Sequence, residues 1–233
     1  MADRLYTEHP GLYDAIQADW DYDRDVAFVL DRMNRHGVNG RRLLEVGCGT
    51  GEHTCRFDAA GFEVTAVDTY EGMLNRARKK CDVAYRHDAL PELSVGGTYD
   101  TIVAIRGVIN HLQPDELEPS IGTLATRLAG DGLLVFDNSP LPPSGNDPAL
   151  DVGSTGEGRY VRVAHHAPTD SGTLDWQAVT FTTDGECFLD TREMTPFADE
   201  TIASTLEHHG FTVETHDGYG TGDSRTVFVA SHQ

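Results

Sequence analysis

Short apolar runs alternate with amphipathic segments from residue 24 to about residue 140. An apolar run of about four to eight residues is typical of a buried strand, while apolar residues spaced three and four apart indicate a helix. Strands that alternate with helices in this way form a doubly wound, mostly parallel sheet. The predicted strands are 41–46, 63–67, 83–86, 99–105 and 133–137, and the predicted helices are 24–36, 52–60, 71–80 and 114–128.

The pattern changes after residue 138. Residues 138–158 are rich in Pro, Gly, Ser and Asp, which predicts a long loop and the segment most prone to disorder. Three runs of alternating apolar and polar residues follow, with Asp184-Gly185 as a turn between the last two, and they predict an antiparallel β insertion after the fifth strand. These runs lie near 159–165, 173–183 and 186–194, and a helix at 198–209 and strands at 211–215 and 225–230 complete the chain.

The first strand leads into the sequence Leu43-Leu44-Glu45-Val46-Gly47-Cys48-Gly49-Thr50-Gly51. Gly47 and Gly49 lack a Cβ atom, so the backbone can turn sharply there and a ligand can approach it closely. The helix that follows leaves backbone N–H groups unpaired beside this turn. Asp68 comes at the end of the second strand, where α/β sheets hold ribose hydroxyls. The glycine turn and Asp68 together predict a nucleoside cofactor.

Acidic residues around the turn favour a cofactor without phosphate groups. The dinucleotide fingerprint has its third glycine at the position of Glu52, whose carboxylate would repel a pyrophosphate. Glu45 adds a second acid near the same turn. S-adenosylmethionine carries an ammonium and a sulfonium and no phosphate. The sequence therefore favours S-adenosylmethionine, with S-adenosylhomocysteine as the product, over a nicotinamide dinucleotide.

The stretch from Leu44 to Gly51 closely resembles the first motif of the class I S-adenosylmethionine-dependent methyltransferases. Segment order and the fragments Leu12-Tyr13-Asp14-Ala15, Asp21-Tyr22 and Glu71-Gly72-Met73-Leu74 are most similar to glycine N-methyltransferase and the aminosugar N,N-dimethyltransferases. The resemblance implies a Rossmann-like sheet of seven strands, the last one antiparallel. It also implies a single domain, divided into an N-terminal cofactor-covering segment and helix (1–37), a cofactor-binding core (38–140), a loop and antiparallel insert (141–196), and a C-terminal helix and last strands (197–233).

The resemblance also implies a role for each matching residue. Gly47, Gly49 and Glu45 would lie near the methionine part of the cofactor, and Asp68 would accept hydrogen bonds from both ribose hydroxyls. Some of these positions have a structural alternative. Asp88 also fits a turn residue and Met73 also fits a core residue. Tyr13 and Tyr22 also fit simple aromatic packing. The other positions are Thr69 and Met73 against the adenine, Asp88 and Ala89 at the adenine amino group, Ile105 and Arg106 beneath the methionine chain, and Tyr13 and Tyr22 over the cofactor.

Polar residues follow the fourth strand at the edge where open α/β sheets bind ligands. Arg106, Asn110 and His111 are the candidate catalytic residues, with His111 as a base or, alternatively, a histidine bonded to backbone at a helix start. The insert adds further substrate-side candidates. They are His165, His166, Trp176 and Arg192, and at most one of the two adjacent histidines can point into a site from a strand.

The amino-acid composition argues against nucleic acid as a binding partner. The chain has 38 acidic and 18 basic residues and a formal net charge of −20, which would repel nucleic-acid phosphates. Only Lys79 and Lys80 are lysines, and this acid-rich, lysine-poor composition favours a halophilic source over an ordinary acidic enzyme. The four cysteines lack metal-like spacing and are interpreted as free thiols. Without a signal peptide or an apolar run long enough to cross a bilayer, the chain is expected to be cytoplasmic.

The sequence thus predicts methyl transfer to a small molecule and favours an amine nitrogen over an oxygen as the acceptor. No metal is required, and a monomer or homodimer is expected. Two alternatives stay open: a non-catalytic protein that binds S-adenosylmethionine, and a nicotinamide-dependent oxidoreductase. The absence of a Tyr-x-x-x-Lys pair argues against the second.

Overall fold

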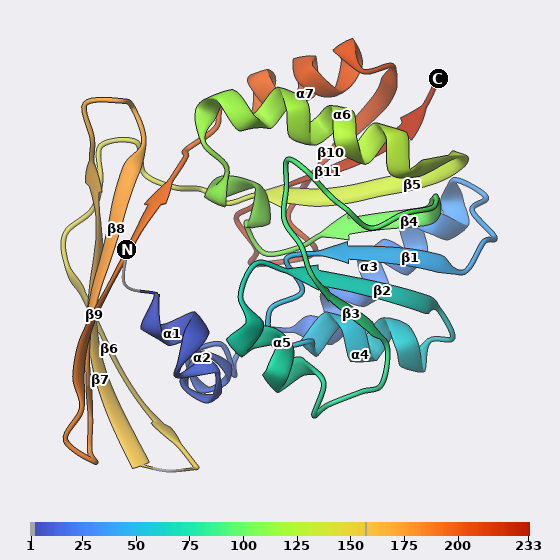
Figure 1. Ribbon diagram of the computed structural model, residues 1–233. Helices are drawn as coiled ribbons and strands as arrows, with labels where there is room; N and C mark the ends of the chain where they lie inside the picture. Colours follow the sequence, from blue (N-terminus) through green and yellow to red (C-terminus); the bar gives the residue numbers. More distant parts are fainter. Residues whose placement is uncertain (1–2, 157) are drawn as a thin grey trace.

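A computed structural model describes residues 3–156 and 158–233. Its larger sheet has seven strands in the order β10-β11-β5-β4-β1-β2-β3 (Figure 1). The last strand, β11, runs opposite to the other six, so the predicted sheet is confirmed. The strands are β1 Arg42–Val46, β2 Glu63–Asp68, β3 Ala84–His87, β4 Tyr99–Ala104, β5 Leu128–Asn138, β10 Phe211–Asp217 and β11 Thr226–His232.

Helices cover both faces of this sheet. Successive residues of a strand point to opposite faces, so Leu43 joins one apolar core and Leu44 the other, and both are fully buried. One core includes α6 (Leu117–Arg127) and α7 (Asp199–His208), while the other includes α3 (Tyr22–Arg35), α4 (Glu52–Ala59) and α5 (Glu71–Ala77). Burial on both faces explains why the central strands are nearly continuous apolar runs.

The insert is a second, antiparallel sheet in the order β6-β7-β8-β9, which stands beside the larger sheet in Figure 1. Its strands are β6 Ala149–Thr155, β7 Gly158–Pro168, β8 Leu174–Thr182 and β9 Cys187–Met194. The predicted loop over 138–158 was therefore partly wrong, because β6 lies within it. Leu150 and Val152 alternate with polar residues there, but β6 is an edge strand whose pairing with β7 no local pattern reveals.

The two faces of the insert differ. Leu5 and Leu12 of the short N-terminal helices α1 (Arg4–Thr7) and α2 (Pro10–Ile16) pack with Tyr160 and Phe188 on the inner face. Both helices lie between the two sheets (Figure 1). The outer face exposes large apolar side chains: Leu150, Val152, Val161, Val163, Phe181 and Leu189.

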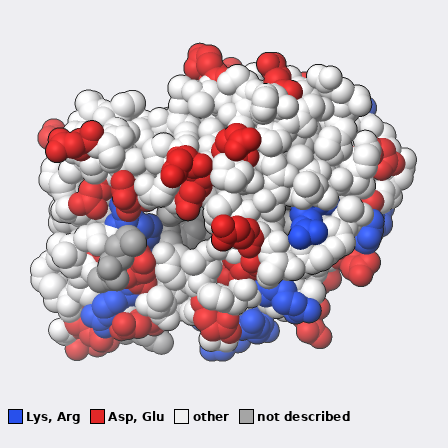
Figure 2. All heavy atoms as spheres, turned by 45° about the horizontal axis from the view of Figure 1, so that its top comes forward, with Lys and Arg blue, Asp and Glu red and all other residues white. Residues whose placement is uncertain are grey.

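Close backbone contact fixes the N-terminal helices against the larger sheet. A Cβ atom at Gly72, in α5, would lie 2.4 Å from the carbonyl oxygen of Thr7 and 2.5 Å from that of Tyr6. Only glycine permits this approach. It brings Tyr6 next to the turn that follows β2. Elsewhere the surface is acidic, and Figure 2 shows Asp and Glu side chains spread over one face with fewer Lys and Arg among them.

The described residues include no helix long and apolar enough to cross a membrane.

The prediction that all cysteines are free was wrong. Cys55 in α4 and Cys81, just after α5, form a disulfide, while Cys48 and Cys187 are free. The crossover connections of the parallel sheet bring the two Cα atoms to 5.5 Å, within disulfide range, although the residues are 26 positions apart. Cysteine spacing alone cannot show such a contact.

Replacing both bridged cysteines, Cys55→Ser with Cys81→Ser, should lower the free energy of unfolding by about 2–4 kcal/mol, because the open chain regains loop entropy when unfolded. Urea unfolding measures the change, with Cys187→Ser as the control. Alkylation of the denatured protein should modify two cysteines without reductant and all four after reduction. Modification of four without reductant would contradict the bridge.

Candidate functional site

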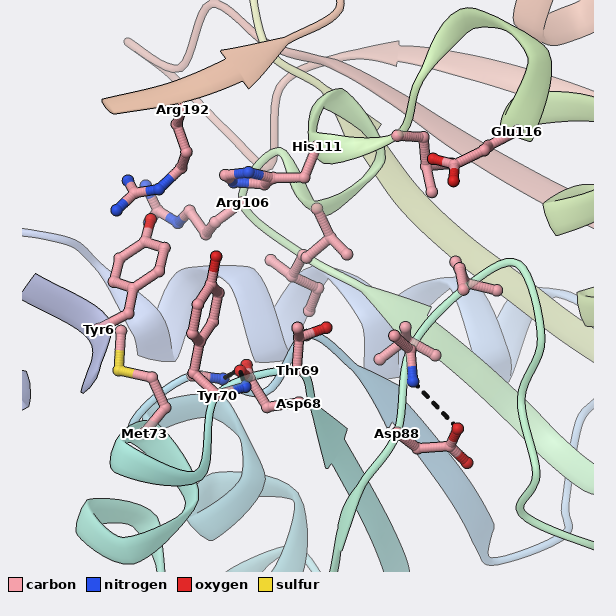
Figure 3. A pocket seen from close by; sticks show the side chains of 18 of the residues that line it. Tyr6, Asp68, Thr69, Tyr70, Met73, Asp88, Arg106, His111, Glu116 and Arg192 are labelled. Atoms are coloured by element: carbon pink, nitrogen blue, oxygen red, sulfur yellow. Dashed lines mark hydrogen bonds between the residues drawn. The ribbon is translucent and has the colours of Figure 1, made fainter. Parts of the chain in front are cut away.

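A cavity of about 320 Å³ opens at the carboxyl edge of the larger sheet, below the inner face of the insert. Arg106, Arg192 and His111 gather at one end above Tyr6 and Tyr70, and Asp88 lies at the other (Figure 3). The lining residues that the sequence had indicated are Tyr13, Gly47, Gly49, Asp68, Thr69, Met73, Asp88, Ala89, Ile105, Arg106, His111 and Arg192. The fold thus collects most of the predicted positions around one space.

The glycine turn forms the floor of the cavity. Gly47 and Gly49 have φ angles of 69° and 54°, in the left-handed region that favours glycine. A Cβ atom at Gly47 would lie 2.6 Å from the Val108 side chain, so glycine is required there. A Cβ atom at Gly49 would meet nothing within 4 Å, so the missing side chain leaves open space on the cavity side.

Asp68, the last residue of β2, binds two loops at once. Its Oδ2 accepts a hydrogen bond from the backbone N–H of Gly49 at 2.8 Å, and its Oδ1 accepts one from the N–H of Tyr70 at 2.9 Å. Burial raises the pKa of Asp68, and the two N–H donors partly offset this effect. Each oxygen retains a lone pair. The carboxylate can therefore hold hydroxyl groups in the cavity while it fixes the surrounding loops.

Asp88, just beyond β3, stabilises its own loop. Its Oδ1 accepts a bond from the N–H of Ala89 at 3.0 Å. Its Oδ2 accepts bonds from the N–H groups of Ser94 and Val95 and from the Ser94 hydroxyl, at 2.8, 3.0 and 2.9 Å. This arrangement matches the alternative of a turn residue, although Asp88 also lines the cavity.

Arg106 follows β4 with a φ of 74°, which is rare for a residue other than glycine. The buried Asp137 carboxylate holds this conformation by accepting bonds from the N–H of Arg106 at 2.5 Å and of Gly107 at 2.7 Å. Tyr219 donates its hydroxyl to Asp137 at 2.7 Å. Burial raises the pKa of Asp137, and these donors and Arg225 oppose that shift.

Asp25 of α3 forms an ion pair with the Arg106 side chain. The Arg106 Nε and Nη2 lie 2.8 and 2.7 Å from Oδ2 of the fully buried Asp25. His53 Nε2 lies 3.0 Å from the same oxygen. Burial alone would raise the pKa of Asp25, but the His53 hydrogen bond and the Arg106 charge lower it. The N-terminal segment is thus bound by charge to the loop beneath the cavity.

Asn110 does not line the cavity. Its amide nitrogen donates to Asn138 Oδ1 at 2.8 Å and to the Thr195 carbonyl at 2.9 Å, and its Oδ1 accepts from the N–H of Ser139 at 2.9 Å. These bonds join the β4 tip to β5 and to the end of the insert. These bonds hold the segment that carries its neighbour, His111, and the catalytic role of Asn110 stays a prediction.

His111 lines the cavity and is an exposed residue. The protein around the ring, followed by the positive charge of Arg192, lowers the pKa of His111. Its neighbour Arg192 reaches the cavity from β9 with Trp176 stacked against its guanidinium. The histidines of β7 stay outside the lining, and the His166 backbone and ring both contact Asn146.

Two predicted cofactor residues lie behind the cavity. The Tyr22 ring packs edge-on against His53 with a centroid distance of 4.9 Å. Glu45 is buried and accepts a bond from the Thr54 hydroxyl at 2.5 Å. Burial raises the pKa of Glu45 to about 8, so this residue is protonated at neutral pH.

Sequence reasoning missed several lining residues. Tyr70 follows Thr69 at a strand end, a position that the sheet-edge rule could have indicated. Gln113 and Glu116 form a capping box, visible as Gln-x-x-Glu before an apolar segment. Tyr6 and Glu193 gave no local signal, because only the packing of α1 and the insert places them at the cavity.

Comparisons with known proteins agree with this geometry. Residues 43–132 match a family described as methyltransferase domain. The chain is 27% identical over 119 residues to a dTDP-3-amino-3,6-dideoxy-alpha-D-glucopyranose N,N-dimethyltransferase of Streptomyces fradiae, covering 50% of this chain and 47% of the relative. It is 28% identical over 133 residues to glycine N-methyltransferase of Oryctolagus cuniculus, covering 48% and 44%. The solved structure of the sugar N-methyltransferase KedS8 from Streptoalloteichus superposes with a TM-score of 0.84 at 22% identity, over 100% of this chain and 96% of that one.

The chain therefore has the fold and the core motif of the class I S-adenosylmethionine-dependent methyltransferases, which confirms the resemblance drawn from the sequence. Within that class it is similar to small-molecule N-methyltransferases. The chain spans about half the length of the curated relatives it matches.

The raised pKa of Glu45 predicts a pH-dependent contribution to stability. Between about pH 4.5 and 8 the folded state keeps the proton and the unfolded state loses it, so this contribution falls as pH rises. Glu45→Gln should remove it. As pH rises over this range, the free energy of unfolding of the variant should increase, relative to that of the wild type, by up to about 1.4 kcal/mol per pH unit.

Urea unfolding at pH 5.5 and pH 8 measures this difference. Glu63→Gln, on the exposed start of the neighbouring strand, is the control. If the wild type and Glu45→Gln show parallel stability profiles, Glu45 is ionised in the folded protein.

Proposed function

We propose that the protein transfers a methyl group from S-adenosylmethionine to an amine nitrogen of a small molecule. The observation that carries the proposal is the joint geometry of Gly49 and Asp68. The glycine leaves open space in the cavity wall, and the adjacent carboxylate is held by two backbone N–H donors with lone pairs to spare. This arrangement fits a ribose next to a close backbone approach.

The rest of the cavity fits the same cofactor. Asp68 would hold the ribose hydroxyls, with Thr69, Met73 and the Asp88–Ala89 turn around the adenine. Ile105 and Arg106 would lie beneath the methionine chain, and Tyr13 would cover it. Tyr22 and Glu45 would support this wall from behind rather than touch the cofactor.

S-adenosylmethionine, when bound, supplies a methyl group already activated by a sulfonium. The task left to the protein is to align the acceptor and to exclude water. His111 is neutral at physiological pH, so its ring can accept a hydrogen bond from the N–H of an unprotonated amine. The related sugar N-methyltransferase and the N,N-dimethyltransferase support nitrogen as the acceptor atom.

Calorimetric titration with S-adenosylhomocysteine and, separately, with NAD tests the cofactor. We expect binding of S-adenosylhomocysteine alone. Asp68→Ala should weaken it by about 1.5–3 kcal/mol, the range for hydrogen bonds to a charged group. Binding of NAD alone would favour an oxidoreductase, and unchanged affinity in Asp68→Ala would remove the ribose assignment. Binding of S-adenosylhomocysteine without any methyl transfer would favour the non-catalytic alternative.

His111→Ala should lower kcat/KM for an amine acceptor by about 100-fold, within the range of side-chain proton-transfer contributions. The affinity for S-adenosylhomocysteine should stay within about twofold. The control is His166→Ala, since that ring lies outside the cavity and contacts Asn146. Equal turnover in His111→Ala and the wild type would assign His111 a structural role.

A further inference from the structure

Arg192 brings a guanidinium to one end of the cavity. The residue is only 6% exposed and lines the cavity from β9. Its Nε donates to Asp3 Oδ1 at 3.2 Å. Its Nη2 is buried and has no hydrogen-bond partner among the described residues. Nη2 is closed off from the cavity, so a ligand oxygen meets the part of the guanidinium that lines it.

The guanidinium is held rigidly. Its carbon lies 3.7 Å from the centre of the Tyr6 ring and 4.6 Å from that of Trp176. The two rings and Asp3 therefore fix the plane of the group before any ligand binds. Figure 3 shows Arg192 directly above Tyr6 and beside His111. A preorganised guanidinium loses little entropy when it binds an oxyanion.

Three other charged side chains at the cavity, those of Arg106, Glu116 and Glu193, already have partners within the protein. Asp25 neutralises Arg106. Glu116 accepts the N–H of Gln113 at 2.8 Å as a helix cap, and Glu193 accepts the hydroxyl of Thr173.

Two carboxylates, those of Asp3 and Asp190, lie near Arg192. Asp3 also accepts the Tyr70 hydroxyl at 3.0 Å, so its carboxylate is shared. Asp190, two residues before Arg192 on the same strand, accepts the N–H of Leu5 at 3.2 Å. Within the described ranges, Asp3 is the carboxylate at ion-pair distance from Arg192. Among the described residues, Nε is the Arg192 atom that donates to a carboxylate, so the guanidinium edge at the cavity can still bind a ligand oxygen.

We infer that Arg192 anchors an anionic oxygen group, a carboxylate or a phosphate, of the molecule that is methylated. This inference rests on the proposed function. The acceptor would place its anion on Arg192 and its amine near His111, beside the methyl donor. Amino acids and phosphorylated amino sugars have this combination of groups, whereas neutral amines and polyamines lack it.

The first test is binding to the protein saturated with S-adenosylhomocysteine. Acetate and inorganic phosphate serve as the two probes in separate calorimetric titrations. We expect one of them to bind the wild type, and Arg192→Gln to weaken that binding at least 10-fold. Arg192→Lys keeps the charge without the planar fork, so its affinity for the probe should lie between those of the wild type and Arg192→Gln. The control is Arg162→Gln, on the same face of the insert but paired with Asp151.

The second test is methyl transfer to matched pairs of amines. One pair compares an amino acid with its decarboxylated amine, and another compares an amino sugar with its phosphate. We expect the anionic member of one pair to be preferred, and Arg192→Gln to reduce that preference 10- to 100-fold with S-adenosylhomocysteine affinity unchanged. The pair that responds distinguishes a carboxylate from a phosphate.

Several results would overturn the inference while leaving the cofactor assignment intact. They are binding of neither probe to the wild type, equal use of neutral and anionic amines, and a preference that survives in Arg192→Gln. Loss of S-adenosylhomocysteine affinity in Arg192→Gln would instead assign the guanidinium to the cofactor. Failure of the wild type to bind S-adenosylhomocysteine at all would refute the proposed function itself.

Discussion

Three aspartates at the carboxyl ends of strands hold the cavity open by accepting backbone N–H groups. Asp68 binds Gly49 and Tyr70, Asp137 binds Arg106 and Gly107, and Asp88 binds its own loop. A loop at a sheet edge has unpaired N–H groups that would otherwise need water. Each carboxylate satisfies two or more of them with charge-assisted bonds, which are stronger than neutral ones. The loops that surround the cavity therefore keep a defined shape without a ligand.

The N-terminal segment is bound to the loops at this edge of the larger sheet by ion pairs and hydrogen bonds. Asp137 binds the Arg106 backbone in its left-handed conformation, and Asp25 binds the side chain of the same residue. Asp14 of α2 likewise accepts the Thr50 hydroxyl at 2.5 Å and pairs with Lys80 at 2.9 Å. The covering helices are thus bound to the cofactor turn by buried or half-buried charges. Such pairs lose more when one partner is removed than they contribute as a pair, so they define an arrangement rather than add stability.

The sequence was sufficient for the larger sheet and for the glycine turn. Apolar runs, helix ends and a glycine turn followed by an acid at the end of the second strand are local signals. The sequence failed where long-range pairing decides the outcome. The Cys55–Cys81 bridge joins segments that only the crossover topology brings together, and β6 becomes a strand only because β7 lies beside it. Asn110 lies on the segment that forms the edge of the cavity, but its side-chain amide donates to Asn138 and Thr195 and does not line the cavity.

The matched methyltransferase domain ends at residue 132, and the insert begins beyond it. The glycine turn, Asp68, Asp88 and His111 lie inside the matched region, whereas Arg192 and Glu193 lie outside it. The two ends of the cavity therefore have different origins in the chain. One end is built from the shared parallel sheet, whose edge geometry suits a nucleoside in many proteins of this fold. The other end joins Arg106 and His111 of the sheet edge to Arg192 of the insert, whose inner face packs against α1 and α2. The guanidinium of Arg192 is therefore the charged group that the insert, rather than the matched region, contributes to that end of the cavity.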